Sequence, residues 1–383
     1  MKILPSDVDT ETQRLHGKLH KLGWTVEDCE LIAPTTLEIN ELKQVQNAVV
    51  LAHSYQTPDI MYGVGDYVGD SYGLSVMATE HPANKIVFCS VYFMGETAKL
   101  LNPDKQVLVP RVAGCSLADS ITGAQVRAVR TKYPHAGIVC YVNTYAEVKA
   151  ESDACCTSSN VVAVVEAMPQ QEIVFIPDRL MGLNLRKMTR KNIITWNGTC
   201  VVHEGFNPDT VRDIRRRFQG VKILAHPECA PGVVALVDYA GGTSGMLDYV
   251  RTSSAKTFML VTECGLTDRF KTEFPCKEIV GTCILCPYMK EIQLEDVLKA
   301  LKDPTPEQFV EIPVDIADRA RVSLERMFEF EKQGKAIMQK RGGSSATSVH
   351  DNVPGWTSAP SPTLLAKWAT DTPINVRSRR RKL

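Results

Sequence analysis

Short apolar runs separated by helical stretches form the dominant pattern along this sequence. Most of these runs are rich in β-branched residues and are bounded by turn residues. The strands expected from the pattern are 48–52, 85–88, 106–109, 137–142, 173–176, 192–195, 222–225, 257–261 and 278–280. Continuous apolar strands that alternate with helices are typical of parallel sheets covered on both faces. The sequence therefore predicts an α/β fold.

Four landmarks recur in the same order in each third of the chain. A strand that ends in polar residues is followed by a hydroxyl-rich turn that opens a helix, by a second strand with a glycine turn, and by a cysteine. They fall at 52–55, 69–72, 93–96 and Cys115, at 141–144, 157–160, 180–183 and Cys200, and at 225–228, 242–245, 263–266 and Cys286. The cysteines are 85 and 86 residues apart. This repeat predicts three similar α/β units that meet around one metal centre.

The repeat and its flanking segments divide the chain into consecutive parts. We expect a helical arm at 1–39, units at 40–115, 116–200 and 201–286, and a tail at 339–383. Helices within 287–338 are expected to complete the first unit. Leu15, Leu19 and Leu22 give the arm an apolar face for packing. The tail is rich in Gly, Ser, Thr and Pro and ends in basic residues, which is the composition of a disordered segment.

Charge and composition narrow the classes of function. Of 383 residues, 44% are hydrophobic and 23% are charged, and Lys+Arg and Asp+Glu both number 44. A formal net charge of zero gives no overall attraction to nucleic acid or to an anionic membrane. No apolar run at the start has signal-peptide length, and none elsewhere is long enough to span a membrane. We therefore expect a cytoplasmic protein that binds neither nucleic acid nor membrane.

Twelve cysteines without a secretory signal argue against a disulfide framework. Those in apolar, strand-like runs are expected to be buried thiols: Cys89, Cys140, Cys155 and Cys156. The pair Cys283 and Cys286 would make half of a zinc site, but no second pair accompanies it. Cys286 with the proline that follows it resembles the end of a ferredoxin cluster loop.

The three cysteines of the repeat admit three interpretations. Cys115, Cys200 and Cys286 on a 4Fe-4S cubane would leave one iron free to act as a Lewis acid. Zinc on three cysteines is the competing chemistry, and buried thiols without a metal are the simplest alternative. Their near-equal spacing favours a shared metal. Cys283 lies outside the repeat and is expected to be a packed thiol, although its nearness to Cys286 leaves a redox role open.

Hydroxyl residues open a helix in every unit. In parallel sheets ligands bind beyond the carboxyl ends of the strands, so the three units are expected to direct their polar landmarks into one cavity. A hydroxyl at a helix start either caps the helix or binds an anion such as phosphate. Ser71, Ser158, Thr243 and Ser244 are the candidates. Because hydroxyl residues lie at the same position of all three units, an anionic substrate is favoured over capping.

Three histidines lie in positions suited to catalysis. His53 and His226 follow equivalent strands of the first and third units, and His203 lies three residues after Cys200. A histidine at a strand end is more often a hydrogen-bonded structural residue than a catalyst. The carboxylate of Glu228, two residues after His226, favours an acid–base pair instead.

Several longer motifs are spread over all three units. They read LAHSYQ at 51–56, GDS at 69–71, FMGETAKLLNP at 93–103, AGCSLAD at 113–119, YVNT at 141–144, WNGTCVVHE at 196–204 and AHPEC at 225–229. Together they resemble the motifs of the quinolinate synthase family, also called the quinolinate synthetase A family. The resemblance covers about 40–335 and leaves out the arm and the tail.

The resemblance implies a reaction, a fold and a cofactor. The reaction is a transfer step of de novo NAD synthesis, in which iminoaspartate and dihydroxyacetone phosphate condense to quinolinate with release of phosphate and water. The fold is three α/β/α units about a pseudo-threefold axis, and the cofactor is a 4Fe-4S cluster with an open iron, bound by Cys115, Cys200 and Cys286. An L-aspartate oxidase or dehydrogenase would supply the imine, and iron–sulfur assembly proteins would build the cluster.

The resemblance also carries over a set of substrate-site residues. They are His53, Tyr55, Ser71, Tyr141, Asn143, Ser158, His203, His226, Glu228 and Thr243. It implies that Glu228, Tyr55 and the histidines move protons, whereas Ser158, Thr243 and Asn143 bind anionic groups.

Three positions depart from the family pattern. Ser54 stands where tyrosine or asparagine is common, and 262–265 reads TECG, where we expect histidine or another residue before the glycine. Gly242 replaces an expected serine, which leaves its backbone amide in place of one phosphate-binding hydroxyl. Two other functions stay open. One is a different hydro-lyase with an open-iron cluster, and the other is a non-catalytic iron–sulfur or zinc protein.

Overall fold

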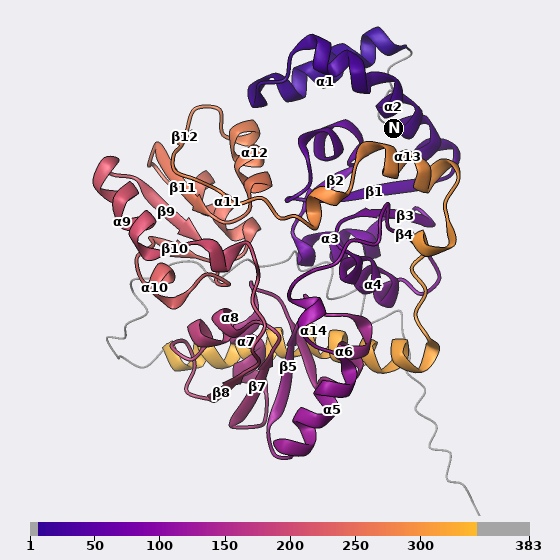
Figure 1. Ribbon diagram of the computed structural model, residues 1–383. Coiled ribbons are helices and arrows are strands. Elements are labelled where there is room, and N and C mark those ends of the chain that lie inside the picture. Colours follow the sequence, from indigo (N-terminus) through magenta and orange to yellow (C-terminus); the bar gives the residue numbers. More distant parts are fainter. Residues whose placement is uncertain (1–6, 343–383) are drawn as a thin grey trace, which may run out of the picture.

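Three four-stranded parallel sheets, each flanked by helices, build the protein. The computed structural model describes residues 7–342. In every sheet the strands lie in the order second, first, third, fourth, so the three units share one topology. Figure 1 shows them arranged around a common centre. The predicted α/β class with three similar units is confirmed.

The units contain the following elements. The first has β1 (Ala48–His53), β2 (Tyr67–Gly69), β3 (Lys85–Cys89), β4 (Gln106–Leu108), α3 (Ser71–Glu80) and α4 (Tyr92–Leu101). The second has β5 (Gly137–Tyr141), β6 (Ala154–Cys156), β7 (Glu172–Ile176), β8 (Asn192–Thr195), α5 (Gly123–Lys132), α6 (Ala146–Ala150), α7 (Val161–Ala167) and α8 (Arg179–Leu185). The third has β9 (Lys222–Ala225), β10 (Tyr239–Ala240), β11 (Thr257–Val261), β12 (Glu278–Ile279), α9 (Pro208–Arg217), α10 (Pro231–Val234), α11 (Thr243–Thr252) and α12 (Cys264–Glu273).

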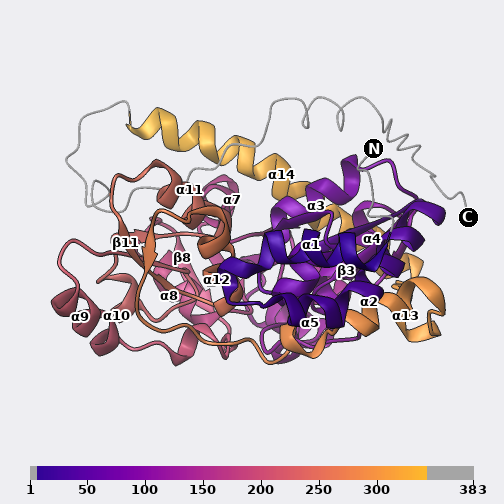
Figure 2. The same cartoon turned by 90° about the horizontal axis from the view of Figure 1, so that it is seen from above.

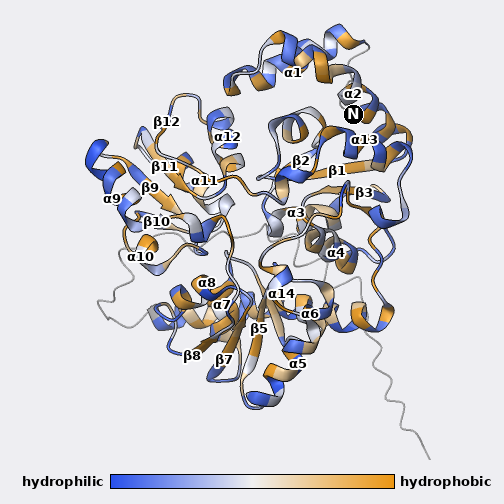
Figure 3. Ribbon diagram, in the orientation of Figure 1, coloured by the Kyte–Doolittle hydropathy of each residue, from blue (hydrophilic) through white to orange (hydrophobic). Residues whose placement is uncertain are grey.

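The nine strands predicted from apolar runs are all present, with ends that differ by at most one residue. Their side chains form the cores of the units, because helices cover both faces of each sheet. Figure 3 shows apolar strands inside each unit and polar residues on outer helices such as α9. The pattern misses β2, β6 and β10, which have only two or three residues and lie at sheet edges.

An aspartate precedes each of these short strands and ties it to its neighbour. Asp66, Asp153 and Asp238 accept hydrogen bonds of 2.9, 2.8 and 3.0 Å from backbone N–H groups of β1, β5 and β9. The three aspartates are 87 and 85 residues apart, so they form a fifth landmark of the repeat. Their spacing could have located the missing edge strands.

Two helices, α1 (Val8–Leu19) and α2 (Val26–Val45), form the described part of the arm. Leu15 and Leu19 are fully buried where these helices pack, as their spacing predicts. Glu11 is also fully buried, and its carboxylate accepts hydrogen bonds from Arg14 and Thr36. α2 continues six residues beyond the predicted end of the arm at 39 and leads almost directly into β1.

The last two long helices pack on different units. α13 (Leu294–Lys302) buries its apolar face in the core of the first unit. α14 (Val314–Gly342) crosses to the second unit, where Leu324 and Met327 join the core and Glu331 accepts a 3.0 Å hydrogen bond from Asn160. Figure 2 shows α14 along one face of the molecule. The prediction that 287–338 completes the first unit is therefore wrong for α14, because its buried face matches the second unit.

α14 also runs past the predicted start of the tail at 339, and 343–383 lies outside the described residues. In the part of the chain that the structure describes, no helix combines the length and the apolar character needed to cross a membrane.

One disulfide joins the start of α12 to the loop that carries Cys286. Cys264 and Cys283 are bonded, with their Cα atoms 5.0 Å apart. The prediction of a packed thiol at Cys283 is wrong. Because β11 and β12 are paired, Cys264, which comes after β11, lies next to Cys283, which comes after β12. The sulfur of Cys286 remains free of this bond.

Removing this disulfide is expected to lower stability. Because it closes a loop of 19 residues, the double variant Cys264→Ser and Cys283→Ser should lose about 3 kcal/mol of unfolding free energy on the chain-entropy estimate. Thermal or urea unfolding without reductant measures the change. Cys276→Ser, at an exposed free cysteine between the same two residues in sequence, is the matched control. Equal midpoints for the double variant and wild type would contradict the expectation.

Candidate active site

A cavity lies between the three units, beyond the carboxyl ends of their first strands. His53 ends β1, Tyr141 ends β5, and His226 directly follows β9. All but one of the candidate site residues line this cavity: His53, Tyr55, Ser71, Cys115, Tyr141, Asn143, Ser158, Cys200, His203, His226, Glu228, Thr243 and Cys286. Ser244, the fourth hydroxyl considered, is not among the lining residues. The topology thus brings side chains from three distant segments to one place.

The three cysteines occupy equivalent positions. Cys115 follows β4, Cys200 follows β8 and Cys286 follows β12, and each of these is the fourth strand of its unit, at the sheet edge opposite the short second strand. A single turn of 3₁₀-helix begins three residues after each cysteine, at Ala118–Ser120, His203–Gly205 and Met289–Glu291. The 85- and 86-residue spacing therefore corresponds to one local structure built three times.

Burial opposes ionisation of all three thiols, and the backbone partly compensates. Burial raises the pKa of Cys115 to about 12, and it raises the pKa values of Cys200 and Cys286 as well. Backbone N–H groups two and three residues further along bond to each sulfur and lower its pKa. A cation in the cavity would complete this stabilisation, because metals bind the thiolate rather than the thiol. The donor set therefore fits a metal group bound by three thiolates.

A buried carboxylate supports the loop of the third cysteine. Glu263 is fully buried, and its Oε1 accepts a 3.1 Å hydrogen bond from the backbone N–H of Cys286. Lys290 lies 3.3 Å from the same oxygen and also donates to the backbone carbonyl of Tyr55. These contacts fix Cys286 against the first unit. Glu263 is the first residue of the glycine-turn landmark at 263–266, but the sequence assigned it no role.

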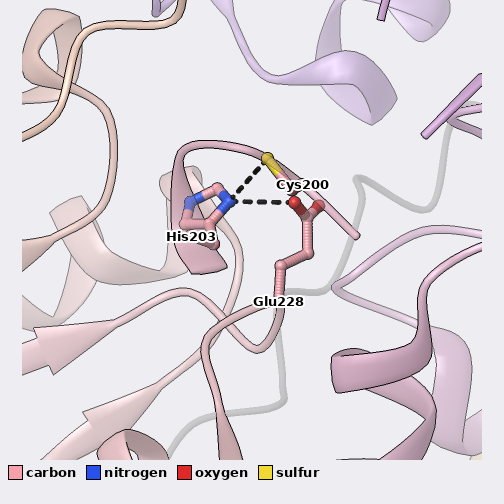
Figure 4. Close-up of side chains that lie close together, drawn as sticks. All are labelled: Cys200, His203 and Glu228. Carbon is pink, nitrogen blue, oxygen red and sulfur yellow. Dashed lines mark hydrogen bonds and ion pairs between the residues drawn. The ribbon is translucent and has the colours of Figure 1, made fainter. Parts of the chain in front are cut away.

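Cys200, His203 and Glu228 form a compact group of possible metal ligands. Their ligand atoms all lie within 4.8 Å of one another. His203 Nδ1 is 3.2 Å from Cys200 Sγ and 2.9 Å from Glu228 Oε2, as Figure 4 shows. The sequence linked His203 to Cys200 by their spacing, and the fold adds Glu228 from the loop after β9.

Glu228 is the most enclosed acid of the cavity. It is 3% exposed, and Tyr141 donates a 2.7 Å hydrogen bond to its Oε1. Burial opposes ionisation, but neighbouring His226 and His203, with hydrogen bonds from His203 and Tyr141, lower the pKa of Glu228 below its usual range. Glu228 is therefore a carboxylate at neutral pH, held between groups of the second and third units.

Two of the histidines are neutral at neutral pH. Burial lowers the pKa of His53 to about 4 and that of His226 to about 3. The ring of His226 stacks on that of His203 with centroids 4.6 Å apart, and His53 meets Tyr55 edge-on at the same distance. A neutral imidazole both accepts and donates, so each ring can exchange a proton with a bound substrate.

The hydroxyl residues of the repeat are not helix caps. The N-caps of α3, α7 and α11 are Asp70, Asn160 and Gly242. Thr243 Oγ1 is buried without a hydrogen-bond partner, and so is Asn143 Oδ1. Buried polar atoms without partners are rare, so these two are available to a polar ligand. This favours the anion-binding interpretation over capping.

Gly242 leaves room for a neighbouring hydroxyl. A Cβ atom at position 242 would lie 2.8 Å from Ser158 Oγ, closer than packed atoms approach. The expected serine would therefore require Ser158 to move. A hydroxyl of the second unit therefore lies directly beside Gly242, at the start of α11.

This chain matches the family model described as quinolinate synthetase A protein over residues 37–329. Curated relatives agree. The chain is 48% identical over 296 residues to a quinolinate synthase of Sinorhizobium fredii, covering 77% of this chain and 82% of the relative. It is 47% identical over 321 residues to that of Sinorhizobium medicae, covering 84% and 89%. It is 49% identical over 290 residues to that of Xylella fastidiosa, covering 76% and 85%.

Proposed function

Because this chain belongs to the quinolinate synthetase A family of enzymes, we propose that it condenses iminoaspartate with dihydroxyacetone phosphate to quinolinate, releasing phosphate and water, in NAD biosynthesis. The observation that carries the proposal is the convergence on one cavity of three equivalent cysteines, an ionised glutamate and neutral histidines. The unpartnered polar atoms of Thr243 and Asn143 suit the anionic groups of both substrates.

The proposed cofactor is a 4Fe-4S cluster held by Cys115, Cys200 and Cys286. The three sulfurs line one cavity, and each accepts backbone N–H hydrogen bonds that favour its thiolate. Within residues 7–342, the ligand atoms of Cys200, His203 and Glu228 all lie within 4.8 Å of one another, whereas the three cysteine sulfurs do not form such a compact group. The wider separation of the sulfurs favours a polynuclear cluster over a single ion. When bound, the cluster would supply an iron without a cysteine ligand as a Lewis acid.

A single metal ion at Cys200, His203 and Glu228 is the second candidate. The compactness of this group favours it, and it would fit a zinc protein. It would also occupy the carboxylate and the imidazole that the proposed chemistry needs for proton transfer. Metal analysis separates the two candidates, as described in the Discussion.

The proposed roles of the side chains follow from their charge and contacts. Glu228 is the general base, because it is ionised and within the cavity, and Tyr141 and His203 hold its two oxygens in place. His53, His226 and Tyr55 exchange further protons during isomerisation and loss of water. Ser71, Ser158, Asn143 and Thr243 bind the phosphate and carboxylate groups. The imine would come from an L-aspartate oxidase or dehydrogenase, and iron–sulfur assembly proteins would load the cluster.

Anaerobically purified, cluster-loaded protein is expected to form quinolinate. The assay supplies dihydroxyacetone phosphate and iminoaspartate generated in place by L-aspartate oxidase, and it measures the pyridine dicarboxylate by chromatography and phosphate by colorimetry. The two products should appear in equal amounts, because each turnover releases one phosphate.

Omission of the triose phosphate is the matched control. A cluster-loaded protein that makes no pyridine dicarboxylate would exclude the proposed reaction. Dehydration of a hydroxy acid by the same preparation would instead identify a different hydro-lyase.

A further inference from the structure

A buried threonine that does not line the cavity connects two of its proton-exchanging residues. Thr262 directly follows β11 and is fully buried. Its Oγ1 lies 2.8 Å from the hydroxyl of Tyr55 and 2.9 Å from Nε2 of His203. One hydroxyl therefore bonds simultaneously to a residue of the first unit and a residue of the loop after Cys200.

These bonds belong to a longer chain of side chains. On its other ring nitrogen, His203 lies 2.9 Å from Glu228 Oε2, and Tyr141 donates to Glu228 Oε1 at 2.7 Å. The sequence of contacts is Tyr55, Thr262, His203, Glu228, Tyr141. Thr262 is the only member of this chain that does not line the cavity, so it acts on substrate only through its neighbours.

The direction of each hydrogen bond follows from the carboxylate. Glu228 only accepts, so His203 must carry its proton on Nδ1. The other tautomer would set the Nδ1 lone pair against a carboxylate oxygen at 2.9 Å and beside the sulfur of Cys200 at 3.2 Å. In a neutral His203 ring Nε2 is then an acceptor, and the single proton of Thr262 points to it. The remaining lone pairs of Thr262 accept the proton of Tyr55.

The packing around Tyr55 makes this arrangement rigid. The Tyr55 ring packs against the core of the third unit beside β11. Ser54, next to Tyr55, accepts a 2.9 Å hydrogen bond from Arg269 of α12. This packing holds the ring in place, so the phenol oxygen stays 2.8 Å from Thr262 Oγ1. Its proton stays on the Thr262 side, and its oxygen lone pairs are available in the cavity.

We propose that Thr262 is a positioning residue, which holds the His203 ring in the orientation that its bond to Glu228 requires and makes Tyr55 present an acceptor oxygen to the substrate. This inference rests on the proposed function for its catalytic consequence, but the hydrogen bonds themselves are independent of it. A threonine is suited to the position because its hydroxyl makes both bonds while its methyl group packs in a site without solvent.

The test uses two variants of the full-length, cluster-loaded protein. Thr262→Val keeps the shape and removes the hydroxyl, whereas Thr262→Ser keeps the hydroxyl. Because misorientation of catalytic groups costs on the order of 100-fold, kcat of the valine variant should fall by about that factor, with little change in KM. The serine variant should recover most of kcat. Iron content and thermal midpoint are measured for both, so that loss of cluster or fold is seen separately.

Tyrosine ultraviolet resonance Raman spectra give a readout that does not depend on turnover. The valine-minus-wild-type difference should show one tyrosine that has lost a hydrogen-bond acceptor for its O–H, and the serine difference should be flat. If the wild type makes no quinolinate but this signature appears, the proposed function fails and the positioning contact stands. Unchanged kcat and spectrum in Thr262→Val, or equal impairment in Thr262→Ser, would overturn the inference.

Discussion

Replacement of Glu228 by Gln is expected to lower kcat by about 10³-fold while the iron–sulfur absorbance is kept. General acid–base groups contribute about 10²–10⁴-fold, and Glu228 is the ionised acid of the cavity. The amide has almost the same shape, but it cannot take a proton from substrate. In the unmutated protein both oxygens of Glu228 accept hydrogen bonds, one from Tyr141 and one from His203. The glutamine replaces one of these oxygens by an NH₂ group, which then faces a donor.

The variant is measured under the same anaerobic assay, with iron and sulfide determined on each preparation. Glu30→Gln, on the exposed side of α2, is the matched control and should behave as wild type. KM for dihydroxyacetone phosphate should change much less than kcat, since the proposed anion-binding residues are left intact. Normal turnover in Glu228→Gln would remove Glu228 from the proposed proton transfers.

Much of this cavity could be predicted from the sequence because parallel sheets place chemistry in a regular position. Polar residues after apolar strands mark the carboxyl ends, so His53, Tyr141 and His226 could be assigned to one cavity before the fold was known. The cysteine spacing had the same origin. Each cysteine follows the fourth strand of its unit, and a repeat of near-constant length keeps that position in register.

The features that sequence missed depend on contacts between repeats or between distant segments. Strands β2, β6 and β10 are too short to show an apolar run, and only the recurring aspartates mark them. The disulfide partner of Cys283 is 19 residues away on an adjacent strand end. Thr262 begins the 262–265 stretch that departs from the family pattern, but the sequence indicates no role for it, because its importance comes from meeting Tyr55 of another unit. Likewise, the sequence does not show which unit α14 packs against, because that depends on the surface that its apolar face meets.

Gly242 is a case in which a departure from the family pattern has a structural reason. From sequence alone it indicates a lost hydroxyl. In the fold, the space that a serine would need is within 2.8 Å of Ser158 Oγ, so the hydroxyl of the second unit lies where the third unit has none. A neighbouring unit thus places a hydroxyl beside the position that lost one, which a repeat read one unit at a time does not reveal.

Single replacement of Cys115, Cys200 or Cys286 by Ala is expected to abolish the cluster and all turnover. In the proposed site each unit would supply one ligand, and removing one would leave two cysteines whose burial raises their pKa values. Iron and sulfide content and the visible absorbance of anaerobic preparations measure the loss. Cys276→Ala, at an exposed free cysteine, and Cys89→Ala, at a buried one, are the controls and should keep the cluster.

The same variants distinguish a cluster from a single ion at Cys200, His203 and Glu228. A single ion there predicts that Cys200→Ala loses the metal, whereas Cys115→Ala and Cys286→Ala keep it. It also predicts that Glu228→Gln releases metal, because a ligand has been removed. A three-cysteine cluster predicts instead that Cys115→Ala and Cys286→Ala are colourless like Cys200→Ala, and that Glu228→Gln stays brown with kcat lowered by about 10³-fold. Stoichiometric zinc in the wild type, retained in Cys115→Ala, would replace the cluster by the single-ion site.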